Sequence, residues 1–137
     1  AGELRTLYIY EEVYQNEMTT KQIAAACKKI ARHGELIRAD NAAKQVIVDL
    51  RTDYGINITG VTKGKNSRQT GYEWLRDLDE IIIDPARCPN AAREFSSYEL
   101  ERDKDGNYKA NYPDRDNHTI DATRYATEND QQNVRVT

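Results

Sequence analysis

The sequence has only two cysteines and no long apolar run. Cys27 and Cys88 lie far apart and form neither a CxxC pair nor a Cys/His cluster, so we predict no disulfide framework and no zinc site. No stretch approaches the roughly 20 apolar residues that a membrane span needs, and no charged segment followed by an apolar one opens the chain. We therefore expect no membrane association and a reducing, cytoplasmic setting.

The chain also lacks an excess of positive charge over negative charge. The 137 residues carry 20 Lys and Arg against 23 Asp and Glu, giving a formal net charge of −3 and a pI of about 5.5. Most nucleic-acid-binding domains attract phosphate with an overall basic field, which this chain lacks. If the chain meets DNA, bound cations or a partner must supply the attraction. The sequence also has no GxxxxGK[ST] phosphate loop, so it contains no P-loop ATPase motor.

The length and composition fit one globular domain. Apolar residues make up 38% of the chain and charged residues 31%, and nine Tyr stand against one Phe and one Trp, so we expect a modest core rimmed by amphipathic rings. No internal repeat or low-complexity linker divides the sequence. We predict a single domain over residues 1–129, followed by a frayed Gln- and Asn-rich tail over residues 130–137.

Hydrophobic periodicity predicts strands that alternate with helices, an α/β fold. Strands are expected over about 6–15, 36–40, 56–61 and 81–83, and helices after Thr19 or Thr20, after Asn41, around Tyr72 to Leu78, from Pro89, and after Asp116 or Asn117. The branched run Ile81 to Ile83 is typical of a strand buried on both faces, which implies a parallel sheet. A projecting polar β-hairpin is predicted near residues 100–112.

His118 and Asp121 are candidate metal ligands. They are three residues apart on a predicted helix, so their side chains share one face and can converge on one point. From spacing alone, the commoner explanation is a histidine at a helix start near an exposed aspartate that favours the positive end of the helix dipole. The pair is therefore suggestive and no more.

Asp40 is a candidate catalytic carboxylate. It follows a predicted strand in an α/β alternation, and ligands usually bind at the carboxyl ends of such strands. Arg38 is a basic group beside it. The alternative, which position alone favours slightly, is that Asp40 or Asn41 simply caps the next helix.

Three further charged residues have mainly structural explanations. Glu11 points to the apolar face of its predicted strand, and an inward charge on an edge strand guards against aggregation. Lys63 and Lys65 flank a glycine in a predicted loop, where they can bind phosphate or, more commonly, keep the loop solvated.

Several segments together resemble the C-terminal nuclease domain of phage terminase large subunits. The resemblance covers most of the chain and rests on the order and spacing of its pieces. These pieces are Leu7-Tyr8-Ile9-Tyr10-Glu11-Glu12, Ile37-Arg38-Ala39-Asp40-Asn41, Val61-Thr62-Lys63-Gly64-Lys65-Asn66-Ser67, Arg87-Cys88-Pro89-Asn90 with Arg93-Glu94-Phe95, Lys104-Asp105-Gly106-Asn107, and His118-Thr119-Ile120-Asp121-Ala122-Thr123-Arg124-Tyr125-Ala126.

The resemblance implies an RNase H-like mixed sheet flanked by helices and an endonuclease that cuts concatemeric double-stranded DNA during packaging. Asp40 and Asp121 match two metal-binding carboxylates of the family, and His118 matches the histidine beside the last one. Two Mg²⁺ or Mn²⁺ ions would activate a water and stabilise the leaving oxygen. The implied partners are double-stranded DNA, the terminase ATPase domain, the portal and the small terminase subunit, in the cytoplasm of a host bacterium that carries a phage or prophage.

One departure from the family pattern bears on activity. The family has a further essential aspartate on its first strand, and this sequence begins at what corresponds to the third strand. We therefore expect a domain truncated at its N-terminus, whose two remaining carboxylates bind metal weakly and which cuts DNA poorly or not at all. The opening Ala1-Gly2 is consistent with an experimentally chosen boundary.

Two other functions fit the residues. The chain could be another RNase H-like nuclease, such as a resolvase or a cutter of RNA–DNA hybrids, which substrate comparison would reveal. It could also be a non-catalytic docking module, because the predicted first strand presents Tyr8, Tyr10 and Tyr14, and Tyr is enriched at protein interfaces. In that case neither Asp40 nor Asp121 responds to metal.

Overall fold

The computed structural model describes residues 5–62, 67–98, 104–107 and 115–133. The chain divides into two compact units: unit 1 comprises Ala1–Glu12 with Lys65–Arg124, and unit 2 comprises Val13–Gly64 with Tyr125–Thr137. A unit defined by contacts need not fold alone, so the single-domain organisation stays a prediction. Within the described residues, no helix is long and apolar enough to cross a membrane.

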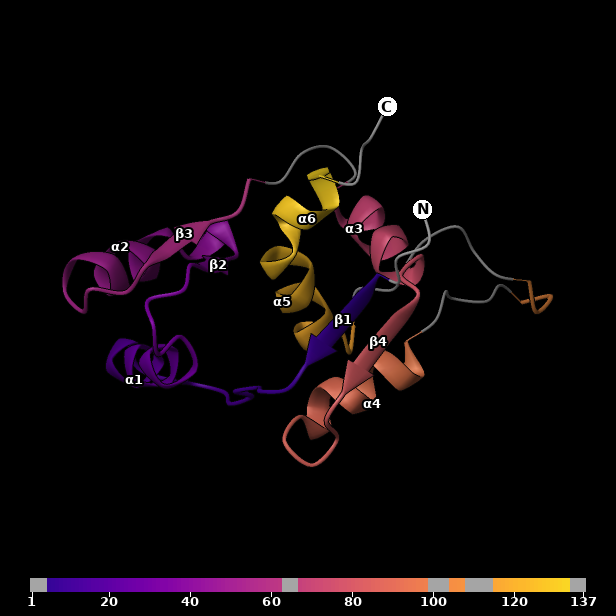
Figure 1. Ribbon diagram of the computed structural model, residues 1–137, viewed down its shortest axis with the longest axis horizontal. Coiled ribbons are helices and arrows are strands. Elements are labelled where there is room, and N and C mark those ends of the chain that lie inside the picture. The colour runs from indigo at the N-terminus through magenta and orange to yellow at the C-terminus, as the bar shows by residue number, and fades with distance from the viewer. Residues whose placement is uncertain (1–4, 63–66, 99–103, 108–114, 134–137) are drawn as a thin grey trace. The chain divides into compact units, whose positions relative to one another are not determined.

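Unit 1 is built around two parallel strands and three helices. Strand β1 (Thr6–Ile9) pairs with β4 (Glu80–Ile83), with Leu7 opposite Ile81, and the two run side by side in Figure 1. The helices in its described residues are α3 (Ser67–Arg76), α4 (Pro89–Ser97) and α5 (His118–Ala126), and the last two residues of α5 belong to unit 2. The core cluster comprises Tyr72, Leu75 and Ile120, with Leu7, Trp74, Leu78, Phe95 and Tyr98 packed against it.

The sheet of unit 1 confirms the parallel pairing but corrects its burial. Ile82 is 42% exposed, and its neighbour in register, Tyr8, is 63% exposed. A continuous apolar run therefore does not mark a strand buried on both faces here. The predicted extent of the first strand is also wrong, since β1 ends at Ile9 and the alternation that continues to Val13 and Tyr14 belongs to exposed chain without strand structure.

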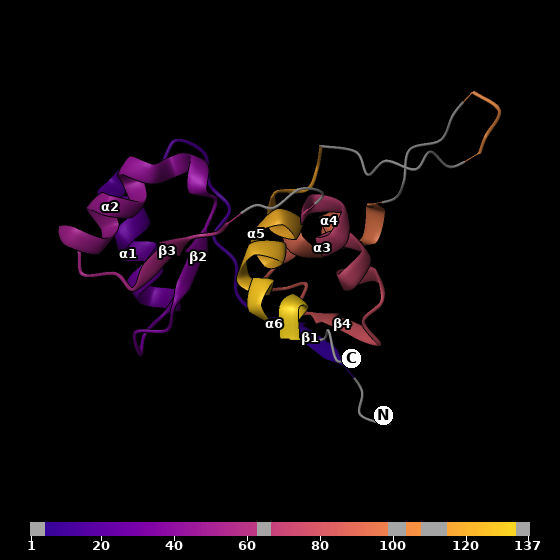
Figure 2. The same ribbon diagram turned by 90° about the horizontal axis from the view of Figure 1, so that it is seen from above.

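Unit 2 contains the second pair of parallel strands. Helix α1 (Thr20–Ile30) has Thr19 as its N-cap, one of the two threonines predicted for that place, and Gln22 completes a capping box with it. Strand β2 (Ile37–Ala39) pairs with β3 (Ile58–Gly60), and between them come a 3-10 turn, η1 (Asn41–Ala43), and helix α2 (Lys44–Thr52), as Figure 2 shows from a second side. The core cluster consists of Ala24, Ile47, Leu50, Ile56 and Ile58.

Other predicted elements are confirmed in part. The α/β alternation holds, and the described residues form two small parallel sheets. Of the predicted hairpin, only residues 104–107 lie in the described part, where they form a turn with Gly106 at a φ of +85°. Helix α6 (Glu128–Asn133) includes the start of the predicted tail, and residues 134–137 lie outside the described residues.

Candidate metal centre

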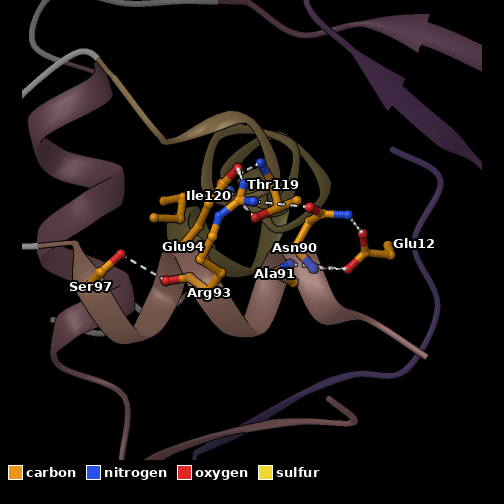
Figure 3. A network of polar contacts seen from close by, with 8 residues as sticks. All are labelled: Glu12, Asn90, Ala91, Arg93, Glu94, Ser97, Thr119 and Ile120. Atoms are coloured by element: carbon orange, nitrogen blue, oxygen red, sulfur yellow. Dashed lines mark hydrogen bonds and ion pairs between the residues drawn. The ribbon is translucent and has the colours of Figure 1, made fainter. Parts of the chain in front are cut away.

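The N-terminus of helix α5 is capped by the buried carboxylate of Glu94. Glu94, which is fully buried, accepts hydrogen bonds from the backbone N–H of Thr119 at 2.8 Å, from the Thr119 hydroxyl at 2.6 Å and from the N–H of Ile120 at 3.3 Å (Figure 3). A carboxylate at this place satisfies N–H groups that a helix start otherwise leaves unpaired and favours the positive end of the dipole. Glu94 therefore sets where α5 starts.

The start of helix α4, which carries Glu94, is capped by a carboxylate in the same way. Glu12 accepts hydrogen bonds from the N–H groups of Asn90 and Ala91, each at 3.0 Å, and from the Asn90 amide at 2.8 Å (Figure 3). Pro89 occupies the first turn of α4, as the sequence predicts. Neither Glu12 nor Glu94 was a candidate in the sequence, because their partners lie 78 and 25 residues away.

Asp121 lies on the first turns of α5, as predicted. Its Oδ1 accepts a 2.5 Å hydrogen bond from the Tyr72 hydroxyl and lies 3.5 Å from Nη2 of Arg124. Across the described residues, every hydrogen bond to this side chain ends on Oδ1. The side chain is 23% exposed, so Oδ2 is an oxygen that a ligand can use.

Tyr72 is itself enclosed by polar and aromatic groups. It is 4% exposed, and its oxygen accepts a 3.0 Å hydrogen bond from the Asn117 amide. Burial, and then the hydrogen bond to Asp121, raise the pKa of the Tyr72 phenol well above its usual range, so the phenol keeps its proton at neutral pH. The guanidinium groups of Arg68 and Arg124 lie 5.6 and 5.5 Å from the ring centre.

His118 is the first residue of α5 and its side chain is exposed. The predicted helical placement of His118 and Asp121, three residues apart, is confirmed. The helix-start alternative fits the exposed His118, whereas Asp121 is only partly exposed and accepts a hydrogen bond from Tyr72. Whether the imidazole binds metal stays a prediction.

Asp40 follows β2 in unit 2, as predicted. It caps the 3-10 turn, because its Oδ1 accepts a 3.0 Å hydrogen bond from the N–H of Ala42, and its Oδ2 lies 3.4 Å from the hydroxyl of Tyr125. The cap is thus Asp40 and not Asn41, and α2 starts only at Lys44. Asp40 has the capping role that was the alternative to a catalytic one, and its role as a metal ligand stays a prediction.

The remaining predicted residues are placed as follows. Arg38 lies in β2 and is half-buried. Lys63 and Lys65 lie outside the described residues. Glu11 follows β1 and is not part of it, so its predicted guard role on an edge strand is wrong; its carboxylate forms a 3.0 Å ion pair with Arg87.

The side chains described above determine whether a metal ion can bind. In the part of the chain that the structure describes, no three His, Cys, Asp or Glu side chains gather closely enough to hold an ion. The donor chemistry nevertheless fits a hard divalent cation, since Asp121 presents one carboxylate oxygen that the protein leaves open. Among the described residues, Asp121 therefore leaves one carboxylate oxygen without a protein hydrogen bond, and its role as a metal ligand stays a prediction.

Comparisons with known proteins agree on one family. The family model for the terminase RNase H-like domain matches residues 3–129. The chain is 41% identical over 125 residues to the large terminase subunit of Bacillus phage SPP1, covering 90% of this chain and 30% of that protein. It is 32% identical over 124 residues to the PBSX phage terminase large subunit of Bacillus subtilis strain 168, covering 90% of this chain and 28% of that protein.

A solved structure gives the same assignment. The crystal structure of the g2p large terminase nuclease domain from bacteriophage SPP1, with bound Mn, matches with a TM-score of 0.84 and 40% identity, covering 92% of this chain and 72% of that one. The chain spans about three tenths of the length of the curated relatives. With this RNase H-like α/β fold and a family match over residues 3–129, the chain belongs to the terminase RNase H-like domain family.

Proposed function

We propose that this chain is the DNA-cutting domain of a phage or prophage terminase large subunit, a metal-dependent endonuclease that cleaves concatemeric double-stranded DNA during packaging. The observation that carries the proposal is the carboxylate of Asp121, held through Oδ1 with Oδ2 open, in a chain 40% identical to a nuclease domain solved with bound Mn. Its place of action would be the cytoplasm of the host bacterium.

Asp121, Asp40 and His118 are the proposed metal ligands. Carboxylate oxygens suit Mg²⁺ and Mn²⁺, and imidazole tolerates Mn²⁺. When bound, a pair of such ions would lower the pKa of an attacking water and offset the charge on the leaving 3′ oxygen. In this site, Asp121 would present a charged oxygen to the ion in a fixed orientation. Asp40 would have to exchange its contact with Tyr125 for the ion while it keeps its backbone cap.

Weak metal binding is part of the proposal. Two carboxylates and one imidazole give few charged ligands, and the described residues gather no group of three. We therefore expect Mn²⁺ dissociation constants far above those of complete sites and slow cleavage or none. Rapid Mn²⁺-dependent cutting by this chain would contradict this part of the proposal.

Arg38, Lys63 and Lys65 are proposed to contact DNA phosphate. Each contact that is lost should reduce the salt dependence of DNA binding by about one unit of slope, without changing sequence preference. The ATPase domain, the portal and the small terminase subunit are the proposed partners in the packaging assembly.

Electron paramagnetic resonance of free Mn²⁺ tests the proposed ligands, because the signal of the hydrated ion falls when the ion binds. The wild type should bind Mn²⁺, and Asp121→Asn and Asp40→Asn should each weaken binding severalfold or more. Asp77→Asn is the matched control, since that carboxylate is exposed and, among the residues that the structure describes, pairs only with its neighbour Arg76. Equal binding by all four proteins would overturn the assignment.

Two other functions remain as outcomes of such tests. Faster cutting of four-way junctions or RNA–DNA hybrids than of duplex DNA would favour another RNase H-like nuclease. The docking function is favoured by Tyr8 and Tyr10, which are 63% and 62% exposed. It would be supported if replacing both with Ser abolished binding to a terminase partner while Mn²⁺ binding remained unchanged.

A further inference from the structure

The orientation of Asp121 is unusually well defined for a partly exposed carboxylate. The last torsion of an aspartate side chain has a broad energy well, so a carboxylate without hydrogen-bond partners samples a wide range of orientations. Here two groups from different helices reach the same oxygen, the Tyr72 hydroxyl on α3 and the Arg124 guanidinium on α5. Fixing one oxygen fixes the other, because the carboxylate is planar.

We infer that Tyr72 is a positioning residue: its hydroxyl holds Oδ1 of Asp121 so that Oδ2 is presented to a divalent cation. The inference rests on the proposed function, namely that Asp121 binds metal, and deepens it. Partners of this kind, which hydrogen-bond to a metal-binding side chain, orient the ligand, and replacing them typically lowers metal affinity by about 10- to 100-fold.

The Asn117 amide helps to orient the O–H bond of Tyr72. Its amide donates to the Tyr72 oxygen at 3.0 Å, and Asn117 is 4% exposed, so water has little access to this bond. A phenol has one proton to donate. With Asn117 donating to the oxygen, that proton points to Asp121 at 2.5 Å. The hydrogen bonds therefore run in one direction, from Asn117 to Tyr72 and from Tyr72 to Asp121.

Arg124 contacts both the Asp121 carboxylate and the Tyr72 ring. It is 7% exposed, its Nη2 lies 3.5 Å from Oδ1, and its guanidinium lies over the Tyr72 ring with 5.5 Å to the ring centre. The positive charge of Arg124 beside Oδ1 reduces the repulsion between Asp121 and other carboxylates at a metal site. Both contacts therefore leave Oδ2 as the oxygen that can take the ion.

A purely structural role for Tyr72 is the competing explanation. The ring belongs to the core cluster of unit 1 and meets Tyr98 edge to face at 5.5 Å. Tyr72→Phe separates the two roles, because it keeps the ring and removes only the hydroxyl. Tyr54→Phe is the matched control, since it removes a phenol from a ring that packs on the core cluster of unit 2.

The test measures Mn²⁺ binding by electron paramagnetic resonance and the ¹³C signal of the Asp121 carboxyl group without metal. We expect Tyr72→Phe to shift that signal and to weaken Mn²⁺ binding about tenfold, while Tyr54→Phe does neither. Wild-type affinity in Tyr72→Phe, with binding still lost in Asp121→Asn, would overturn the inference and leave the proposed function standing. Wild-type affinity in Asp121→Asn would overturn both.

A second variant covers the case in which Tyr72→Phe does not fold. Asn117→Ala keeps the phenol and removes one of the groups that hydrogen-bond to its oxygen, while Arg68 remains. We expect a smaller loss of Mn²⁺ affinity in the same direction and a smaller shift of the Asp121 carboxyl signal. An unchanged affinity and an unchanged signal in a folded Asn117→Ala protein would contradict the inference.

Discussion

The two carboxylates singled out in the sequence, Asp121 in unit 1 and Asp40 in unit 2, are held in different ways. Asp121 accepts side-chain hydrogen bonds on one oxygen and leaves the other open. Asp40 uses one oxygen for a backbone cap and places the other near Tyr125. A position at the end of a strand therefore does not by itself identify a metal ligand; the groups around the carboxylate decide which oxygen is available.

The difference has its origin in the scaffolds of the two units. Asp121 stands on a helix whose start is fixed by a buried carboxylate, and that carboxylate stands on a helix capped by Glu12. Asp40 stands on a short 3-10 turn and is itself the cap. Replacing Asp40 therefore removes the cap of its turn, and replacing Asp121 removes the acceptor of the buried Tyr72 hydroxyl.

The largest expected effect comes from removing the support of α5. Glu94→Ala leaves the N–H groups of Thr119 and Ile120 without their acceptor and opens a cavity, so we expect the free energy of unfolding to fall by about 2–4 kcal/mol. Chemical denaturation measures this loss. Glu94→Gln keeps an acceptor and should lose less.

The control for this prediction is Glu73→Ala, whose carboxylate accepts one hydrogen bond from Gln69 within α3. It should change the free energy of unfolding by no more than about 0.5 kcal/mol. In Glu94→Ala, the NMR signals of Tyr72 and Asp121 should move more than those of the Asp40 turn, which contacts α5 through Tyr125 near the end of that helix. Equal movement at both carboxylates would break the comparison between the units.

An intermediate effect is expected at Asp40. Asp40→Ala removes the acceptor for the N–H of Ala42, so we expect a loss of about 1 kcal/mol in unfolding free energy. Asp40→Asn retains an acceptor of the same shape and should be nearly neutral for stability while it weakens Mn²⁺ binding. If Asp40→Ala were as stable as the wild type in thermal denaturation, the capping role would be wrong.

The smallest effect concerns pH. Because folding raises the pKa of Tyr72 above its ordinary value of about 10, the stability it contributes is fully present below about pH 10 and is lost as the pH rises towards the folded pKa. The difference in unfolding free energy between wild type and Tyr72→Phe should therefore shrink above pH 10. A difference that stayed constant from pH 8 to pH 11 would contradict this.

Local signals in the sequence predicted much of the fold. The N-cap at Thr19, Pro89 in the first turn of α4 and the period-two alternation around Leu7 each depend on neighbours within a few residues. The errors occurred where a local pattern continued without a partner. The alternation beyond Ile9 has no strand to pair with in the described residues, so β1 ends there.

The candidate site was predicted less completely. Spacing identified His118 and Asp121 as residues of one helix turn, and the alternation of strands and helices placed Asp40 after β2. Tyr72 and Glu94 could not be found in this way, because each meets its partner across 49 or 25 residues and reads locally as an ordinary helix residue. Only the packing of α3, α4 and α5 brings these groups together.

Site-resolved NMR with Mn²⁺ tests the central claim most directly, because the bound ion broadens signals near it. We expect selective broadening around residues 118–121 in the wild type, with weaker broadening around residue 40, and loss of the first in Asp121→Asn while Asp77→Asn behaves as the wild type. Broadening that is uniform over the chain, or that persists around residues 118–121 in Asp121→Asn, would contradict the account of Asp121 as the prepared metal ligand.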